Sequence, residues 1–147
     1  MDYKLLCAQL KALTEDVENE ISNLSNASAL LWQELGDINW AGFYKMEGGI
    51  LVLYPFQGKP ACTKIAVGKG VCGTAVAEDR TQLVPDVHQF PGHIACDCAS
   101  NSEIVVPIRV GGEIWGVLDI DSPNLNRFDE NDRKGLEEFV KILEEVL

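Results

Sequence analysis

The first 36 residues carry a hydrophobic pattern with the period of an α-helix. Apolar side chains recur at steps of three and four residues at Tyr3, Leu6, Leu10, Leu13 and Val17. The same spacing returns at Leu24, Leu31 and Leu35, with Ala27 and Trp32 nearby. Because this spacing places apolar groups on one face of a helix, it predicts two amphipathic helices with a break near Thr14.

After Asn39 the pattern changes to that of β-strands. The stretches NWAGFYKM and ILVLYPFQ flank Glu47–Gly49, which predicts a hairpin with a tight turn. A third strand is predicted over 62–67. The glycines of GKGVCGTAVAED indicate that this strand ends there and that a short helix begins around Gly73.

The last third of the chain predicts a second hairpin and a closing helix. EIVVPIRV and EIWGVLDID are separated by Gly111 and Gly112, as in a hairpin, and Asp129 is suited to cap a final helix. Together the elements describe an α+β fold in which helices cover one antiparallel sheet. A length of 147 residues suits one domain over 1–147.

Between these parts, the segment from Leu83 to Ser102 shows neither period and is predicted to be mostly irregular. It holds both histidines and two of the five cysteines. Irregular segments of this length in compact domains are usually functional. We therefore expect it to contribute to the site.

The charge and composition of the chain exclude several classes of partner. A net charge of −11 repels phosphate, which argues against nucleic acid and anionic membrane surfaces. No apolar run reaches the roughly 18 residues of a membrane span, and the opening MDYKLLCAQL lacks the regions of a secretion signal. We expect a cytoplasmic protein, in which five cysteines are better explained as buried, metal-binding or catalytic than as a disulfide framework.

Strand alternation places two aromatic rings on one face of the first strand. Trp40, Gly42 and Tyr44 share that face, and the glycine leaves a gap between the rings. The gap is either a slot for a small ligand with a soft group such as a thioether, or a close backbone approach in a core strand.

The same alternation brings three carboxylates together on the second hairpin. Asp119 and Asp121 share one face of their strand with Trp115, and Glu103 projects from the partner strand. Asp121 also fits the turn chemistry of Asp-Ser-Pro, whereas Asp119 lies among apolar residues, where a charge needs a partner or a task. Acids beside aromatic rings suit an ammonium group or a transferable proton.

The five cysteines have different expected roles. Cys7 reads as a small buried residue of the first helix, and Cys62 at the start of a strand fits simple packing. Cys72 lies near the start of the short helix, where the helix N-terminus can lower a thiol pKa. Cys96 and Cys98 bracket Asp97 in the irregular segment and are expected to be more accessible.

Three other interpretations of these motifs are weaker. Four possible zinc ligands, His88, His93, Cys96 and Cys98, fall close together, but no CxxC pair is present and we expect no metal. GKGVCG satisfies GxGxxG, yet its surroundings are antiparallel rather than βαβ. A triad of Cys96, His93 and Asn101 rests only on sequence proximity.

The motifs NWAGFY, GKGVCGTA, DVHQFPGHIACDCASNSEIVVPI and GVLDIDSPNLNRFDENDRKGLE resemble the free methionine-R-sulfoxide reductases, a single-domain GAF-fold family, over nearly the whole chain. The resemblance implies a central antiparallel sheet with the N- and C-terminal helices on one face and a ligand pocket on the other. It implies reduction of free L-methionine-R-sulfoxide with thioredoxin as reductant and no cofactor. A homodimer through the terminal helices is a further expectation.

The resemblance also implies residue roles. Cys96 corresponds to the cysteine that attacks the sulfoxide, and Cys72 and Cys62 to the recycling cysteines, in an order left open. The implied substrate contacts are Trp40, Tyr44, Glu103, Asp119 and Asp121. Cys98 departs from the family pattern, which has a small residue without a thiol there. The alternative function is a GAF sensor that binds a small molecule without turnover, although such modules normally regulate an attached effector.

Overall fold

The computed structural model describes residues 1–92 and 99–147. The helices are α1 (Tyr3–Thr14), α2 (Glu20–Glu34), α3 (Gly70–Glu78) and α4 (Glu130–Glu144), with a short 3₁₀ helix η1 (Val87–Gln89). The strands are β1 (Trp40–Glu47), β2 (Ile50–Gly58), β3 (Lys64–Ala66), β4 (Gln82–Val84), β5 (Ser102–Val110) and β6 (Glu113–Ser122).

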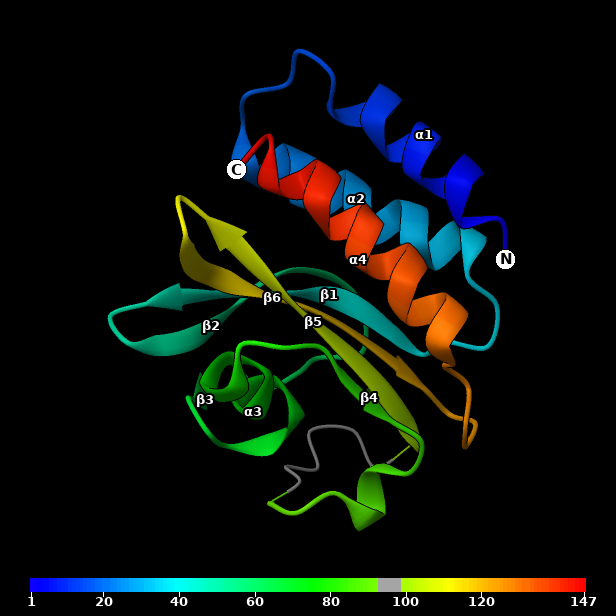
Figure 1. The fold of residues 1–147 in the computed structure, drawn as a ribbon, viewed down its shortest axis with the longest axis vertical. Coiled ribbons are helices and arrows are strands. Elements are labelled where there is room, and N and C mark those ends of the chain that lie inside the picture. Colours follow the sequence, from blue (N-terminus) through cyan, green and yellow to red (C-terminus); the bar gives the residue numbers. More distant parts are fainter. Residues whose placement is uncertain (93–98) are drawn as a thin grey trace.

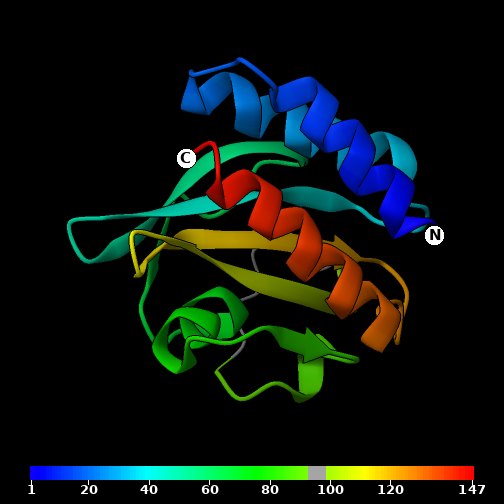
Figure 2. The same cartoon turned by 45° about the horizontal axis from the view of Figure 1, so that its top comes forward.

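The strands of the described residues form one antiparallel sheet in the order β3-β2-β1-β6-β5-β4. Helices α1, α2 and α4 lie on one side of this sheet and α3 lies on the other (Figures 1 and 2). Helix α2 packs on β1 and β2, α4 packs on β5, and α1 bridges the two helices from outside. This arrangement confirms the α+β prediction and the placement of the terminal helices on one face.

Each face of the sheet has its own apolar core. On the helical face, the largest fully buried side chains include Phe43, Phe139 and Leu118. On the opposite face a smaller core forms around Leu51, Val105 and residues of α3. Because alternate residues of a strand point to opposite faces, each central strand contributes to both cores, and the smaller core adjoins the pocket described below.

The predicted boundaries hold except around the third strand. Strand β3 begins at Lys64, so Cys62 lies in the loop before it, and α3 begins at Gly70, which places Cys72 inside its first turn. The segment predicted to be irregular overlaps the last two residues of β4, a three-residue edge strand whose period is too short to recognise. No helix of the described part has both the length and the apolar character needed to cross a membrane.

The contact between α1 and α4 depends on Gly135. A Cβ atom at this position would lie 2.0 Å from Cγ of Tyr3. The Tyr3 ring cannot retreat freely, because its hydroxyl donates a buried hydrogen bond to Asp132 Oδ1. Glycine therefore sets the spacing of the two helices.

We predict that Gly135→Ala destabilises the fold although alanine is the better helix former. Overpacking costs about 1–3 kcal/mol, against a propensity gain of roughly 1 kcal/mol. Urea denaturation should show a lower midpoint than for the wild type. Lys134→Ala, on the exposed side of the same helix turn, is the matched control and should change stability by less than about 0.5 kcal/mol. Equal midpoints for Gly135→Ala and the wild type would contradict the packing argument.

Candidate active site

The register of three strands builds one continuous row of chemically useful side chains. Trp40 of β1 pairs with Asp121 of β6, which pairs in turn with Glu103 of β5. Two residues further along β1, Gly42 pairs with Asp119. The aromatic and acidic positions singled out by strand alternation therefore do share a face, and it is the face opposite helices α1, α2 and α4.

The aromatic rings stack on one another and leave no open slot over the glycine. Trp40 stacks on Phe56 with ring centroids 5.0 Å apart and on Tyr44 at 5.9 Å. A Cβ atom on Gly42 would lie 2.2 Å from Cβ of Phe56. The close-approach interpretation of Gly42 is therefore correct and the slot interpretation is wrong, because Phe56 of the neighbouring strand fills the space.

Both pocket aromatics also hold the loop between β2 and β3. The Trp40 Nε1–H donates to the carbonyl of Lys59 at 3.1 Å, and the Tyr44 hydroxyl donates to the carbonyl of Cys62 at 3.0 Å. Cys62 is disulfide-bonded, whereas Cys7 and Cys72 are free thiols. This loop thus forms a fixed wall over the aromatic end of the pocket.

Cys72 faces the acids from the opposite side. Its thiol donates to Asp119 Oδ2 at 3.4 Å, and both residues are buried. Burial, followed by the charges of Asp119 and Glu103, raises the pKa of Cys72 well above the ordinary thiol value. The expected lowering by the helix N-terminus is therefore wrong, because desolvation and nearby anions both oppose a thiolate.

The two buried acids, Glu103 and Asp119, differ in how strongly their surroundings raise the pKa. Burial, and then the charges of Asp119 and Asp121, raise the pKa of Glu103 well above its ordinary value. Burial also raises the pKa of Asp119, but hydrogen bonds from Glu103 and Cys72 act against that rise. Glu103 consequently keeps its proton while Asp119 is the first to ionise, an arrangement that can donate a proton and bind a cation side by side.

The start of α3 completes the pocket and was missed as a site element. Lys69, Gly70 and Val71 line the cavity together with the acids and rings, and Ser100 closes another side. The side chain of the N-cap residue, Lys69, makes no capping hydrogen bond to this helix N-terminus. The motif GKGVCG could have predicted this part of the pocket, since a glycine-rich turn that opens a helix presents free N–H groups to an anion.

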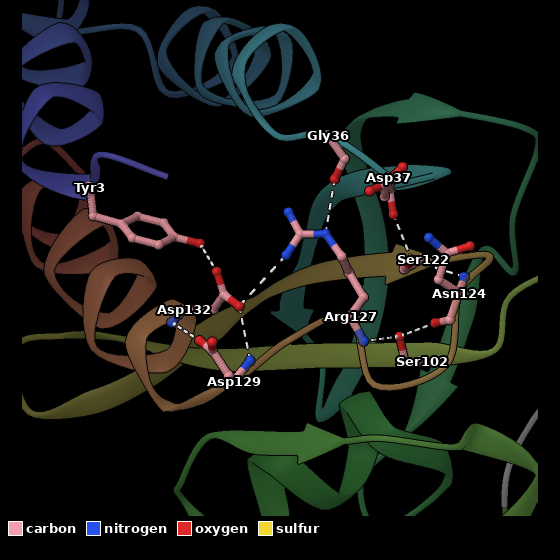
Figure 3. Close-up of polar contacts among 9 residues, drawn as sticks. All are labelled: Tyr3, Gly36, Asp37, Ser102, Ser122, Asn124, Arg127, Asp129 and Asp132. Carbon is pink, nitrogen blue, oxygen red and sulfur yellow. Dashed lines mark hydrogen bonds and ion pairs between the residues drawn. The ribbon is translucent and has the colours of Figure 1, made fainter.

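Two buried serines hold the strand ends that carry the carboxylates (Figure 3). Ser102 and Ser122 pair across β5 and β6, and each directly adjoins an acid of the site in its own strand. The Ser102 hydroxyl donates to the carbonyl of Asn124, and the Ser122 hydroxyl donates to the carbonyl of Asp37. These bonds tie the strand ends to the loops on either side.

A second part of the same network fixes the loop that follows β6. Arg127 donates from Nε to the carbonyl of Gly36 and pairs with the carboxylate of Asp132, which also receives the Tyr3 hydroxyl (Figure 3). Asp132 forms a capping box with Asp129 at the start of α4, as predicted for a helix capped at Asp129. The acids therefore rest on rigid, mutually anchored elements.

Trp115 does not belong to this face, contrary to the alternation argument. The pairing of β5 with β6 shifts between Ile108 and Arg109, so that Trp115 is the extra residue on β6. Its ring packs against the helical core, and its Nε1–H donates to Glu20 Oε1. A bulge reverses the side on which preceding residues project, and sequence alternation alone does not reveal it.

Within residues 1–92 and 99–147, one group offers ligand atoms close enough together for a metal ion. Cys72, Glu103 and Asp119 each present one atom, all within 4.8 Å of one another. Because the pKa of Cys72 and that of Glu103 are both raised, these two groups hold protons and the cluster is better suited to hydrogen bonding. Of the proposed zinc ligands, His88 contacts Asn101 Oδ1 through Nε2.

Several predicted residues lie outside the described residues, namely His93, Cys96 and Cys98. The assignment of Cys96 as the nucleophile therefore stays a prediction. Asn101, the third member of the considered triad, donates to the carbonyl of Pro123 and contacts His88, which gives it a structural role.

Comparison with known proteins agrees with this geometry. The GAF domain family model matches residues 8–147. The chain is 54% identical over 145 residues to the free methionine-R-sulfoxide reductase of Escherichia coli, a match that covers 99% of this chain and 88% of that protein. The chain belongs to the free methionine-R-sulfoxide reductase family.

Solved structures show how closely the fold follows that family of GAF-domain oxidoreductases. The reduced form of fRMsr of Staphylococcus aureus superimposes with a TM-score of 0.97 at 59% identity, covering 99% of this chain and 95% of that one. The free methionine-R-sulfoxide reductase from Neisseria meningitidis, solved in complex with its substrate, gives a TM-score of 0.95 at 44% identity, covering 98% and 87%. The pocket described above is thus set in the frame of a free methionine-R-sulfoxide reductase.

Proposed function

We propose that this protein reduces free L-methionine-R-sulfoxide to L-methionine, with thioredoxin as the reductant. The observation that carries the proposal is the placement of two buried acids, Glu103 and Asp119, in one pocket with the stacked rings of Trp40 and Tyr44. It is supported by relatives named for this reduction at high identity. The whole chain, 1–147, would act as one GAF domain in the reducing cytoplasm.

The pocket offers a separate partner for each group of a free amino acid. Asp119 Oδ1 is buried and has no hydrogen-bond partner among the described residues, so it is available to a substrate ammonium. The uncapped start of α3, with Lys69, would receive the carboxylate. Trp40 and Tyr44 would contact the methyl group and sulfur.

The chemistry is an oxygen transfer to Cys96. Its thiolate attacks the sulfoxide sulfur while Glu103 gives a proton to the oxygen, because unprotonated oxide is not a viable leaving group. The adduct holds an S–S bond between Cys96 and the substrate sulfur, which carries the protonated oxygen. The hydroxyl then passes to the Cys96 sulfur, the S–O and S–S bonds to the substrate sulfur break, methionine leaves, and Cys96 keeps the oxygen as a sulfenic acid. Sulfur of the substrate is reduced and Cys96 is oxidised by two electrons.

Cys62 is the recycling cysteine in this proposal. Condensation of its thiol with the sulfenic acid releases water and leaves a disulfide, which thioredoxin reduces. Cys62 is the described cysteine that is disulfide-bonded, and it lies in an anchored loop at the pocket. Cys72 suits this step less well, because its raised pKa disfavours the thiolate.

A GAF sensor would bind the same ligand without turnover. We predict that thioredoxin-coupled NADPH oxidation follows addition of free L-methionine-R-sulfoxide. N-acetyl-L-methionine-R-sulfoxide lacks the ammonium and leaves Asp119 unpaired, so its kcat/KM should be lower by about 100-fold or more. Binding without NADPH oxidation would favour the sensor. Equal rates with both substrates would contradict the role given to the carboxylates.

A further inference from the structure

We propose that Cys72 is a positioning residue whose thiol, by its hydrogen bond, holds Asp119 ready to receive the substrate ammonium. The inference rests on the proposed function and goes beyond it, because it assigns Cys72 a role without redox chemistry. It replaces the expectation that Cys72 recycles the enzyme.

The backbone fixes the thiol firmly. Cys72 lies in the first turn of α3, and that turn is bound to the end of β3 by backbone hydrogen bonds from Gly68 to the Gly73 carbonyl and from Lys69 to the Ala66 carbonyl. A Cβ atom on Gly73 would lie 2.4 Å from the Ala66 carbonyl oxygen, so the turn sits as close to β3 as a glycine allows. The sulfur therefore has little freedom to approach a distant partner.

The thiol acts on one oxygen of Asp119 and leaves the other for the ligand. Cys72 donates to Oδ2 at 3.4 Å, whereas Oδ1 is buried and has no partner among the described residues. A donor on one oxygen fixes the rotation of the carboxylate and favours its charged form. Both effects strengthen binding of a cation at Oδ1.

The chemical state of Cys72 suits a donor and not a nucleophile. Its side chain is 4% exposed, and burial with nearby carboxylates keeps it as the neutral thiol. Only the protonated sulfur can donate. Among residues 1–92 and 99–147, the titratable groups around Asp119 are Cys72 from α3, Glu103 from β5, Asp121 from β6 and Tyr44 from β1. Hydrogen bonding from Cys72 lowers the pKa of Asp119.

The test compares Cys72→Ser, which keeps a donor but has no redox chemistry, with Cys72→Ala, which has neither. We expect the serine variant to keep KM for free L-methionine-R-sulfoxide within about threefold of the wild type. The alanine variant should raise KM about tenfold with kcat changed by less than about threefold. Its acid limb of kcat/KM should move to higher pH, because the pKa of Asp119 rises when the donor is lost.

Two outcomes would overturn the inference. Equal loss of thioredoxin-dependent turnover in both variants would mean that Cys72 is a redox residue. Unchanged KM and acid limb in Cys72→Ala would mean that the hydrogen bond does not position Asp119. Circular dichroism melting checks that each variant is folded.

The proposed function and the positioning role of Cys72 can be rejected separately. If the wild type itself does not turn over, the proposed function fails. Carbon NMR titration of the Asp119 carboxylate still tests the inference, since it should give a higher pKa in the alanine variant than in the wild type or the serine variant. An identical Asp119 titration in all three proteins would reject it.

Discussion

Replacing Cys96 with serine is expected to abolish methionine formation, with kcat/KM lowered by about 10⁴-fold or more. A thiolate is the nucleophile in the proposed oxygen transfer, and a serine hydroxyl is far less acidic and cannot carry the oxygen as a sulfenic acid. The measurement is methionine released in a single turnover, by chromatography, without thioredoxin. This readout isolates the first chemical step from recycling.

Cys98 supplies the matched control, because it is a thiol two positions away in the same segment. Cys98→Ser should release close to one methionine per chain, as is also expected of the wild type. Cys62→Ser should also release about one methionine per chain but fail to turn over repeatedly with thioredoxin, since it lacks the resolving thiol. Full methionine release by Cys96→Ser would remove this residue from the scheme.

The second large effect is expected for Glu103→Gln, which should lower kcat by about 10²–10⁴-fold. An amide keeps the shape of the side chain but has no acidic proton to give to the departing oxygen. In the wild type kcat should fall as pH rises through the raised pKa of Glu103, because the donor must be protonated. The variant should lose this alkaline limb, as a pH series of kcat will show.

The same substitution should stabilise the fold, most clearly at alkaline pH. Because burial raises the pKa of Glu103, the folded chain binds its proton more tightly than the unfolded chain. Unfolding free energy therefore falls as pH rises from about 4.5 through the raised value, and Glu103→Gln removes this loss. Thermal melting at pH 5 and pH 8 should show a Tm advantage for the variant that grows with pH.

Glu113→Gln is the control for both measurements, since Glu113 is exposed at the start of β6 on the same hairpin. It should leave kcat and its pH profile unchanged and alter Tm little at either pH. If Glu103→Gln retained the wild-type kcat, Glu103 would not be the proton donor and another acid would have to be. A Tm difference independent of pH would contradict the assignment of a buried, proton-holding carboxyl.

Local patterns in the sequence were sufficient to predict most of the helices and strands. Helical periodicity located α1, α2 and α4, and two glycine turns located both hairpins, because these signals depend only on neighbouring residues. Strand β4 was not predicted, since three residues are too few to show the period of a strand. The start of α3 was placed three residues late, because Gly70 already adopts the first helical turn.

The sequence by itself determined which side chains share a face within each strand. Alternation along a strand is a local property, so Trp40 and Tyr44 could be assigned to one face of β1, and Asp119 and Asp121 to one face of β6, before any pairing was known. The tertiary structure alone decided how these groups behave. The bulge at Trp115 turned its ring to the other face, Phe56 from β2 filled the space over Gly42, and burial together with carboxylates from β5 and β6 reversed the expected pKa shift of Cys72. Each of these depends on atoms distant in the chain, and a pKa or an open space is set by everything that lies nearby in three dimensions.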